Sequence, residues 1–493
     1  MNKKNYMVID FGASSGRVSV AGFDGNSINF SEIHRFENRP VQLGETLFWD
    51  FLRLYSELEK GIQAGMFSVK EIISVGIDSW GDDFGLIDKN GMLISNPIHY
   101  RDDYRNSLGE QLYAIIPQKE LFRITGGQLA TEVGLFGLYG MVLKDATELK
   151  AAERLLMIPD LFNYFLTGYL VNEFTVATTA LMFNTPKKRW AYEIFDKIGI
   201  PEKLFQDVIS PGHDLGPISS SVSKRLDIRP LKVIVPCTHD TASAVTGIPV
   251  LSDKKKWGFI SMGTWCILGM ESNDLIIDDS ILGTGFFNEG GAEDKNLFVK
   301  DINGMWIMQQ CKSRWEFELN REIGWQEIDK LASEARPLSC FINVDAAEFT
   351  GMANDMPNAV REFCKNTGQT VPSSIGEITR CVYESLALRF RYDIARLEMF
   401  SGTNIEILHL VGGGINNRLL CQWTANSTGK NIIAGPAETT SVGNLIMQLK
   451  VTGQIRSVSE GRKIVLESFH TVEYSPAERN IWDSSYERYL KII

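Results

Sequence analysis

Histidine is scarce in this chain of 493 residues, and closely spaced pairs of cysteines are missing. It has six histidines and seven cysteines, and no two cysteines stand in a C-x-x-C pair, so no zinc-binding spacing is present. An odd number of scattered cysteines is typical of reduced thiols in a cytoplasmic protein. Cys364 and Cys381 could still pair if the fold brings them together. We therefore expect a cytoplasmic protein whose thiols are mostly buried.

Long hydrophobic runs and excess positive charge are also missing. No window approaches the roughly 20 apolar residues that cross a membrane. The run between Lys4 and Asp10 is too short for a signal peptide. With 50 basic and 61 acidic residues the formal charge is −11, which opposes nonspecific binding to nucleic acid or anionic lipid. We expect neither a membrane nor a nucleic acid as partner, and a monomer or a homodimer.

What is present is ample material for an α/β protein of two large domains, with 44% hydrophobic and 23% charged residues. The sequence predicts a buried strand at residues 6–12 that ends in a glycine turn, and two further strands at 17–23 and 27–36 around a second turn. A second strand–turn–strand pattern occupies residues 256–271. The pattern changes from helix-rich to strand-rich near Gly247, which predicts domains at 1–247 and 248–493. Helical patterns dominate between residues 104 and 168, and 375–400 reads as one long helix.

Two glycine-cornered hairpins could bind phosphate. In D-F-G-A-S-S-G-R (10–17), consecutive backbone N–H groups and small hydroxyls can surround phosphate oxygens, and Asp10 could hold Mg²⁺ through water. No Gly-Lys-Ser/Thr follows, so this is not a Walker A loop. S-M-G-T-W (261–265) repeats the arrangement with Thr264 at its tip. The alternative in both cases is a tight hairpin whose glycines only permit the turn.

Two further segments place small or polar residues after a predicted strand. V-G-G-G-I-N-N-R (411–418) would let the backbone approach a flat ligand such as adenine or ribose; the alternative is a tight strand-to-helix turn. C-T-H-D-T-A-S-A (237–244) puts His239 and Asp240 at a strand end before a small-residue helix. A carboxylate there is stabilised as an anion and can accept a proton. Spacing alone favours the alternative, in which Asp240 is a helix N-cap.

Acidic and aromatic residues are dense in I-D-S-W-G-D-D-F-G (77–85) and I-H-Y-R-D-D (98–103). They could bind sugar hydroxyls, with Trp80 stacking on the apolar face of the sugar. The alternative is a solvated hairpin around the turn 88–91.

Taken in order, these elements resemble the FGGY carbohydrate kinases across nearly the whole chain. The stretches that carry the resemblance are DFGASSGR, GIDSWGDDFGLID, IHYRDD, MIPDLFNYFLTG, THDTASAV, SMGTW, NEGG and VGGGINNRLL with AGPAETTSVGN. The resemblance implies a two-domain, ribonuclease-H/actin-like fold with ATP and Mg²⁺ in the cleft between the domains. It implies ATP contacts at Ala13, Ser14, Ser15, Gly16, Arg17, Thr264, Gln309 and Gly413. It also implies sugar contacts at Gly81, His239, Asp240 and Thr241, with Asp240 as the proton acceptor.

One position departs from the family pattern. In K-D-I-N-G (300–304), Asp301 stands where the family has a substrate-binding Asn, and a carboxylate accepts hydrogen bonds but donates none. The resemblance implies phosphorylation of the C1 hydroxyl of a 6-deoxy-ketohexose, L-rhamnulose first, with its epimer L-fuculose as the competitor. A plain ATPase or acyl-phosphate-forming enzyme of the same fold is a second hypothesis. A non-catalytic sugar sensor is a third, disfavoured because Asp10, Thr264 and Asp240 are all present.

Overall fold

The computed structural model describes residues 3–250, 255–351 and 355–493. The chain forms two compact units, and the first takes segments from both halves of the sequence. The first unit comprises Met1–Leu251, Glu271–Phe298 and Thr439–Phe469. The second comprises Ser252–Met270, Val299–Glu438 and His470–Ile493. The predicted division at residue 247 stays a prediction.

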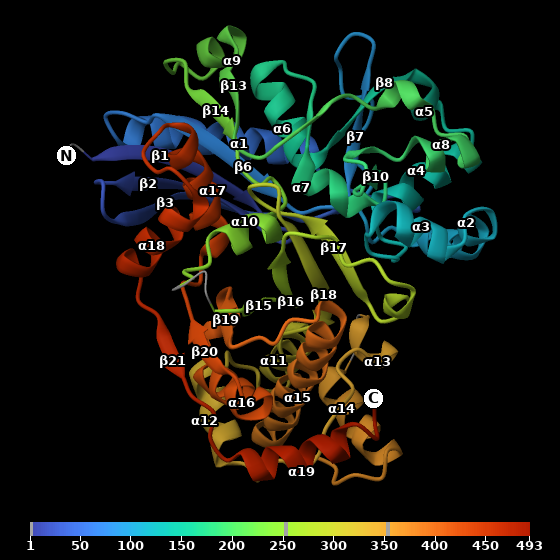
Figure 1. Ribbon diagram of the computed structural model, residues 1–493, viewed down its shortest axis with the longest axis vertical. Coiled ribbons are helices and arrows are strands. Elements are labelled where there is room, and N and C mark those ends of the chain that lie inside the picture. The colour runs from blue at the N-terminus through green and yellow to red at the C-terminus, as the bar shows by residue number, and fades with distance from the viewer. Residues whose placement is uncertain (1–2, 251–254, 352–354) are drawn as a thin grey trace. The chain divides into compact units, whose positions relative to one another are not determined.

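The first unit is built on a six-stranded sheet with the order β13-β14-β6-β1-β2-β3 (Figure 1). Its strands are β1 (Lys4–Phe11), β2 (Ser15–Phe23), β3 (Ile28–Glu37), β6 (Ser74–Ser79), β13 (His213–Pro217) and β14 (Lys232–Val235). The first three pair antiparallel, whereas β1, β6 and β14 run parallel. The opening strands were therefore predicted correctly, and β1 is the buried strand that its apolar run indicated.

Helices cover both faces of this sheet. Phe51, Leu54 and Leu58 of α1 (Phe51–Ser68) share one core with Met7 and Ile9 of β1, and α6 (Ile158–Thr167) joins the same core. On the other face lie α17 (Thr439–Val451) and α10 (Asp240–Thr246), with α17 crossing β1 and β6 (Figure 1).

The two helices α10 and α17 pack backbone against backbone. A Cβ on Gly443 would lie 1.8 Å from the Ser243 carbonyl oxygen, which no side chain can occupy. Only glycine therefore fits at this crossing, and the crossing fixes α10 over the strand ends.

A second core of the first unit holds the predicted helical stretch. Its elements are β7 (Phe84–Asp88), η1 (Asp103–Leu108), α2 (Gly109–Ile115), α3 (Gln118–Thr125), α4 (Gly134–Leu143), α5 (Thr147–Ala151), β8 (Ala152–Met157), α7 (Phe174–Ala177) and α8 (Tyr192–Ile198). The strand β8 interrupts the stretch in which helical patterns were expected to dominate. It pairs antiparallel with β7, and its apolar run of Leu155, Leu156 and Met157 is buried on both sides. A short buried apolar run of this kind fits either a helix or a strand, and pairing with β7 makes this one a strand.

The second unit is built on the strands β18-β16-β15-β19-β20-β21, neighbours in that order. They are β15 (Trp257–Met262), β16 (Trp265–Ser272), β18 (Asn296–Asn303), β19 (Ile407–Val411), β20 (Asn431–Ala434) and β21 (Val472–Tyr474). The strand β15 is antiparallel to β16 and parallel to β19, and β19 is parallel to β20. Both units thus place an antiparallel hairpin beside parallel strands, which confirms the predicted α/β, ribonuclease-H-like architecture.

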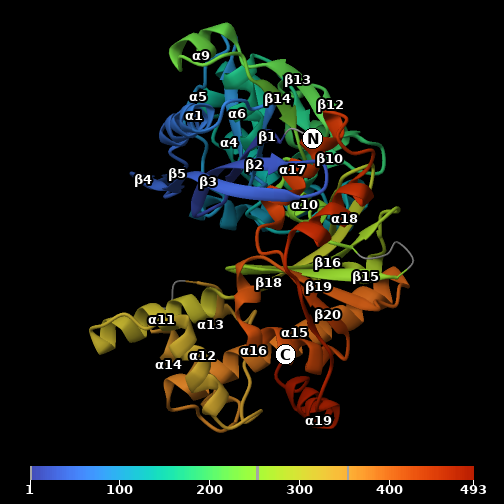
Figure 2. The ribbon, with the colours of Figure 1, turned by 90° about the vertical axis from the view of Figure 1, so that its left-hand side faces the viewer.

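Helices of the second unit pack around the long central helix α15 (Ile375–Ser401) (Figure 2). Its neighbours are α11 (Trp306–Leu319), α12 (Trp325–Glu334), α14 (Met356–Asn366), α16 (Arg418–Thr428) and α19 (Arg479–Tyr489). Ser374 caps α15 and exchanges hydrogen bonds with Glu377, while Gly402 ends it in a left-handed conformation. The predicted helix 375–400 is confirmed. None of the helices in the described ranges combines the length and the hydropathy that crossing a membrane requires.

Candidate active site

Three carboxylates meet at the carboxyl ends of the parallel strands of the first unit. Asp10 ends β1 and is the register partner of Asp78, which lies on β6. Asp240 begins α10, after the loop that follows β14. The Ser79 N–H donates to the Thr238 carbonyl at 2.8 Å, which ties this loop to the end of β6. The sheet topology therefore collects residues that are far apart in sequence at one edge.

Burial and mutual repulsion raise the pKa of two of these carboxyl groups, Asp78 and Asp240. Burial raises the pKa of Asp78, which is fully covered, and the neighbouring Asp10 raises it further; a hydrogen bond from Asn444 Nδ2 to Asp78 Oδ2 (2.5 Å) acts in the opposite direction. Burial also raises the pKa of Asp240, with His239 lowering it and Asp10 raising it. The Asp240 side chain is still 34% exposed. It is thus an accessible carboxylate whose basicity is increased, as a proton acceptor requires.

The oxygen-rich donor set fits Mg²⁺. Asp78 Oδ1 is buried without a hydrogen-bond partner, and Asp10 faces Arg17 at 2.8 Å. Among the described residues, no three of the carboxylates bring their oxygens within 4.8 Å of one another. A direct all-protein cage is therefore not formed, whereas Mg²⁺ normally keeps several waters and takes one or two carboxylates. The residues fit a hydrated Mg²⁺ near Asp10 and Asp78.

The structure decides against the N-cap interpretation of Asp240. The N-cap of α10 is His239, which makes no side-chain capping bond, and Asp240 is the first helical residue. The Asp240 carboxylate lies 3.5 Å from His239 Nε2, and Thr241 Oγ1 donates to it only at 3.4 Å. The N-cap alternative, which spacing alone favoured, is wrong, and the carboxylate is left for another task.

His239 is held as a cation by an acidic residue that sequence reasoning missed. Its Nδ1 lies 3.3 Å from Oε2 of Glu289, in β17 (Phe286–Gly290), as an ion pair. Burial alone would lower the pKa of His239, but Glu289, with Asp240 and Asp82, raises it to about 10. An acidic residue inside the apolar strand F-F-N-E-G was the available signal.

A second missed residue, Glu173, fixes the loop before Asp240. Its carboxylate accepts from Thr238 Oγ1 at 2.6 Å and from the Thr238 N–H at 3.1 Å. It also accepts from Thr175 Oγ1 at 2.5 Å, and Thr175 Oγ1 in turn accepts from the His239 N–H at 3.1 Å. Glu173 is fully buried, and burial raises its pKa. These bonds set the backbone of residues 238–239 and hence the position of Asp240.

The predicted phosphate hairpin lies at the same edge. Ala13 and Ser14 are exposed at its tip, which is closed by the Gly12 N–H donating to the Ser15 carbonyl at 2.9 Å. A Cβ on Gly16 would lie 2.2 Å from the Phe36 ring, so the close packing requires glycine there. The structure thus brings Ala13–Arg17 to the end of β1 beside Asp10.

The predicted sugar-binding segment divides into buried and available parts. Trp80 is 5% exposed and packs on Trp49 with ring centroids 4.1 Å apart, so it offers no open face for stacking. Asp83 is fully buried and pairs with Arg105 at 2.9 Å. The solvated-hairpin alternative is wrong as well, because β7 is buried. Gly81 lies against Thr179, whose Oγ1 accepts from the Asp82 N–H at 2.9 Å.

The second unit gathers three predicted ATP contacts. Thr264, at the β15–β16 turn, and Gln309, on α11, lie 3.3 Å apart between Thr264 Oγ1 and Gln309 Nε2. The glycine run follows β19, the parallel neighbour of β15, and a Cβ on Gly412 would lie 2.8 Å from the Met262 carbonyl oxygen. Open space surrounds Gly413. Asp301 lies on β18, partly buried.

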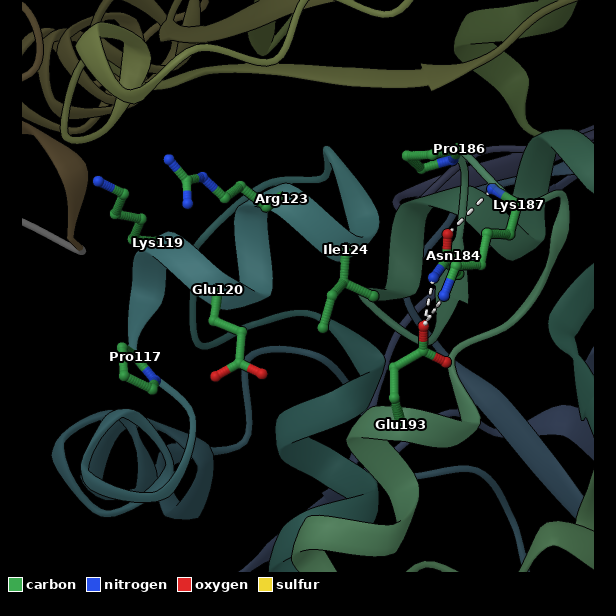
Figure 3. Close-up of a pocket in the computed structure, with 9 residues that line it drawn as sticks. All are labelled: Pro117, Lys119, Glu120, Arg123, Ile124, Asn184, Pro186, Lys187 and Glu193. Atoms are coloured by element: carbon green, nitrogen blue, oxygen red, sulfur yellow. Dashed lines mark hydrogen bonds and ion pairs between the residues drawn. The ribbon is translucent and has the colours of Figure 1, made fainter.

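The first unit has two pockets among its described residues. One has a volume of about 480 Å³ and is drawn in Figure 3. It is lined by Pro117, Lys119, Glu120, Arg123, Ile124, Asn184, Pro186, Lys187 and Glu193. Within it Lys187 Nζ pairs with Glu193 at 3.1 Å, and Asn184 also donates to Glu193 (Figure 3). The other, of about 200 Å³, is lined by residues that include Phe84, Arg105 and Lys144. Neither is lined by a residue that the family resemblance assigns to ATP or sugar, but the smaller pocket takes Phe84, Gly85 and Ile98 from the two predicted sugar-binding segments.

The geometry agrees with family comparisons that cover most of the chain. Residues 5–247 match the N-terminal domain of the FGGY family of carbohydrate kinases, and residues 258–451 match its C-terminal domain. The chain belongs to this family. It is an FGGY carbohydrate kinase, as the resemblance of the motifs implied.

Two relatives of this FGGY kinase are rhamnulokinases. A rhamnulokinase of Bacteroides thetaiotaomicron is 35% identical over 484 residues, covering 98% of each chain. A rhamnulokinase of Enterococcus faecalis is 35% identical over 497 residues, covering 100% of this chain and 98% of the relative.

Solved structures show the same fold at low identity. A ligand-bound xylulose kinase from Lactobacillus acidophilus has a TM-score of 0.82 at 16% identity, with 99% of this chain and 97% of that chain covered. A glycerol kinase from Plasmodium falciparum, solved with ADP, has a TM-score of 0.78 at 15% identity, with 99% and 98% covered. These likenesses establish the two-domain kinase fold.

Proposed function

We propose that this FGGY kinase transfers the γ-phosphoryl group of MgATP to the C1 hydroxyl of a 6-deoxy-ketohexose, L-rhamnulose in the first place. The observation that carries the proposal is the accessible, basic Asp240 beside Asp10 and Asp78 at one strand edge. The rhamnulokinase names of relatives at 35% identity support the choice of sugar. Asp301 remains the reason to keep L-fuculose as the alternative substrate.

The nucleotide would be held by residues of both units. The amides and hydroxyls of Ala13–Arg17, together with Thr264 and Gln309, have the chemistry to bind phosphate oxygens, and the open space at Gly413 suits the nucleoside. Asp10 would hold Mg²⁺ through water. When bound, MgATP supplies the phosphoryl group and the divalent charge that offsets its phosphates. Because such transition states are loose, positioning and charge stabilisation are the protein's main contributions.

The chain's own residues would activate the sugar. Asp240 accepts the proton from the C1 hydroxyl, since burial makes this carboxylate a stronger base than a solvated one. His239, as a cation paired with Glu289, can donate a hydrogen bond to a sugar oxygen. Gly81 and Thr241 are the further sugar contacts that the family resemblance implies. Glu173 holds Thr238 and thereby keeps Asp240 in place.

An assay of ADP release tests both the reaction and the base. We expect sugar-dependent ADP release, with the highest kcat/KM for L-rhamnulose among L-rhamnulose, L-fuculose, L-xylulose and L-ribulose. Asp240→Asn should lower kcat by about 10²- to 10⁴-fold and leave ATP binding intact, because a general base contributes that much. Asp145→Asn, a change of an exposed carboxylate paired only with Lys150, is the control.

Each result that differs from these expectations would overturn a different part of the proposal. Near-normal turnover of Asp240→Asn removes this residue from the role of base. ADP release that does not need sugar favours the plain ATPase, and calorimetric sugar binding without turnover favours the sensor. Preference for glycerol or an aldose places the protein on another branch of the family.

A further inference from the structure

Three cysteine thiols converge in the second unit. Cys340 lies in the segment between α12 and α14, Cys364 on α14 and Cys381 on α15. Their Sγ atoms all lie within 4.8 Å of one another, and those of Cys364 and Cys381 are 4.0 Å apart. All three carry free thiols and are at most 2% exposed. In the described part of the chain this is the only group of three such donors.

The spacing matches coordination of a single ion. Three sulfurs bonded to one ion at about 2.3 Å in a trigonal plane lie √3 times that distance apart, or about 4.0 Å. The cysteines therefore need only small shifts to share an ion. Packing as small apolar side chains is the ordinary use of buried cysteine, but it does not require three separate segments to aim their sulfurs at one point.

The segment that carries Cys340 also meets a neighbouring helix and solvent. Arg488 donates to the carbonyls of Leu338 and Ser339 at 2.9 and 3.1 Å, which brings one guanidinium to this segment. Ser339, half-buried next to Cys340, offers an approach from solvent.

We propose that Cys340, Cys364 and Cys381 form a three-thiolate site for one thiophilic d¹⁰ cation of the Zn²⁺, Cd²⁺ or Cu⁺ class. An all-sulfur donor set selects soft ions over Mg²⁺ or Ca²⁺. Binding replaces the thiol protons, which leave to solvent, and involves no electron transfer. The bound ion ties the segment around Cys340 to α14 and α15, so the site is structural and stabilises the second unit.

Cadmium titration of the reduced, full-length protein tests the site. We expect one equivalent of Cd²⁺ to bind, with the ultraviolet thiolate-to-cadmium charge-transfer absorption of three bonds and a matching mass in native mass spectrometry. Cys340→Ser, Cys364→Ser and Cys381→Ser should each weaken binding by at least about a hundredfold, because loss of an outer-shell partner alone costs about 10- to 100-fold. Cys421→Ser, a change of a buried cysteine on α16 outside the cluster, should bind Cd²⁺ as the unchanged protein does. Competition by Zn²⁺ and by Cu⁺ then identifies the preferred ion.

A second measurement on the unchanged protein avoids variants that fail to fold. Bound Cd²⁺ should slow alkylation of Cys340, Cys364 and Cys381 together and leave the rate at Cys421 unaltered. The proposal is overturned if no binding saturates at one equivalent, if Cys421→Ser loses as much affinity as the other variants, or if the reduced protein contains a disulfide among the three. Metal binding is read directly, so its failure leaves the kinase proposal untouched.

Discussion

The two sheets share a topology but carry different chemistry at the same edge. In the first unit the hairpin β1–β2 stands beside the parallel strand β6; in the second the hairpin β15–β16 stands beside the parallel strand β19. The strand ends of the first carry Asp10 and Asp78. Those of the second lead to Thr264 and to Gly412–Gly414.

This difference separates what the fold supplies from what the side chains supply. Both hairpins turn at a glycine corner, a shape that suits phosphate. The first adds Asp10 and Asp78 at the ends of its parallel strands, which suit Mg²⁺ and proton transfer, whereas the Thr264 turn of the second offers a hydroxyl and the amide of Gln309, with Asp301 on β18 as its acidic residue. The proposal therefore assigns metal and base chemistry to the first unit.

The largest effect on this comparison is expected when a carboxylate is removed from the sheet edge of the first unit. Asp10→Asn should lower kcat by about 10²- to 10³-fold, the usual cost of losing one preorganised charge-stabilising group. The Mg²⁺ concentration for half-maximal activity should rise, because the amide binds Mg²⁺ more weakly. Steady-state kinetics across a Mg²⁺ series measure both.

Asp24→Asn provides the matched control for Asp10→Asn. Asp24 lies at the other end of the same sheet, where its carboxylate accepts from the N–H groups of Asn26 and Ser27. Activity should be kept in this variant. An Asp10→Asn enzyme with unchanged Mg²⁺ dependence would remove Asp10 from the metal site.

A smaller effect is expected at the second edge. Thr264→Val keeps the shape of the side chain but removes the hydroxyl. It should raise KM for ATP by about 10- to 100-fold, because a hydrogen bond to a charged group contributes about 1.5–3 kcal/mol. Thr350→Val, an exposed threonine of the same unit, is the control. A change in KM for the sugar with none for ATP would contradict the division of roles.

Local patterns predicted the fold better than they predicted the site. Signals within a few residues predict these elements. Apolar runs beside glycine turns predict the strands of both hairpins, and the Ser374 cap marks the start of the helix α15. β8 was missed because its identity depends on pairing with β7.

Long-range contacts also explain the errors at the site. Trp80 was expected to stack on a sugar, but Trp49, far away in sequence, covers it. Glu173 acts on Thr238 across 65 positions of the chain, and the three thiols meet from three segments. The roles assigned to Ala13–Arg17, Thr264, Gln309 and Gly413 came from the family resemblance and stay predictions, as do the cytoplasmic location and the oligomeric state.

The smallest effect concerns the pH dependence set by His239. The base works only when Asp240 is deprotonated, so kcat/KM should fall as the pH drops through the raised pKa of Asp240. His239 lowers that pKa, and a neutral residue in its place removes the effect. His239→Gln should therefore move the acidic limb of the pH profile to higher pH, beyond any loss of sugar affinity. His34→Gln, which breaks only the contact with Glu57 at 2.6 Å, should leave the limb in place. A limb that stays fixed in His239→Gln would mean that a group other than Asp240 is titrating.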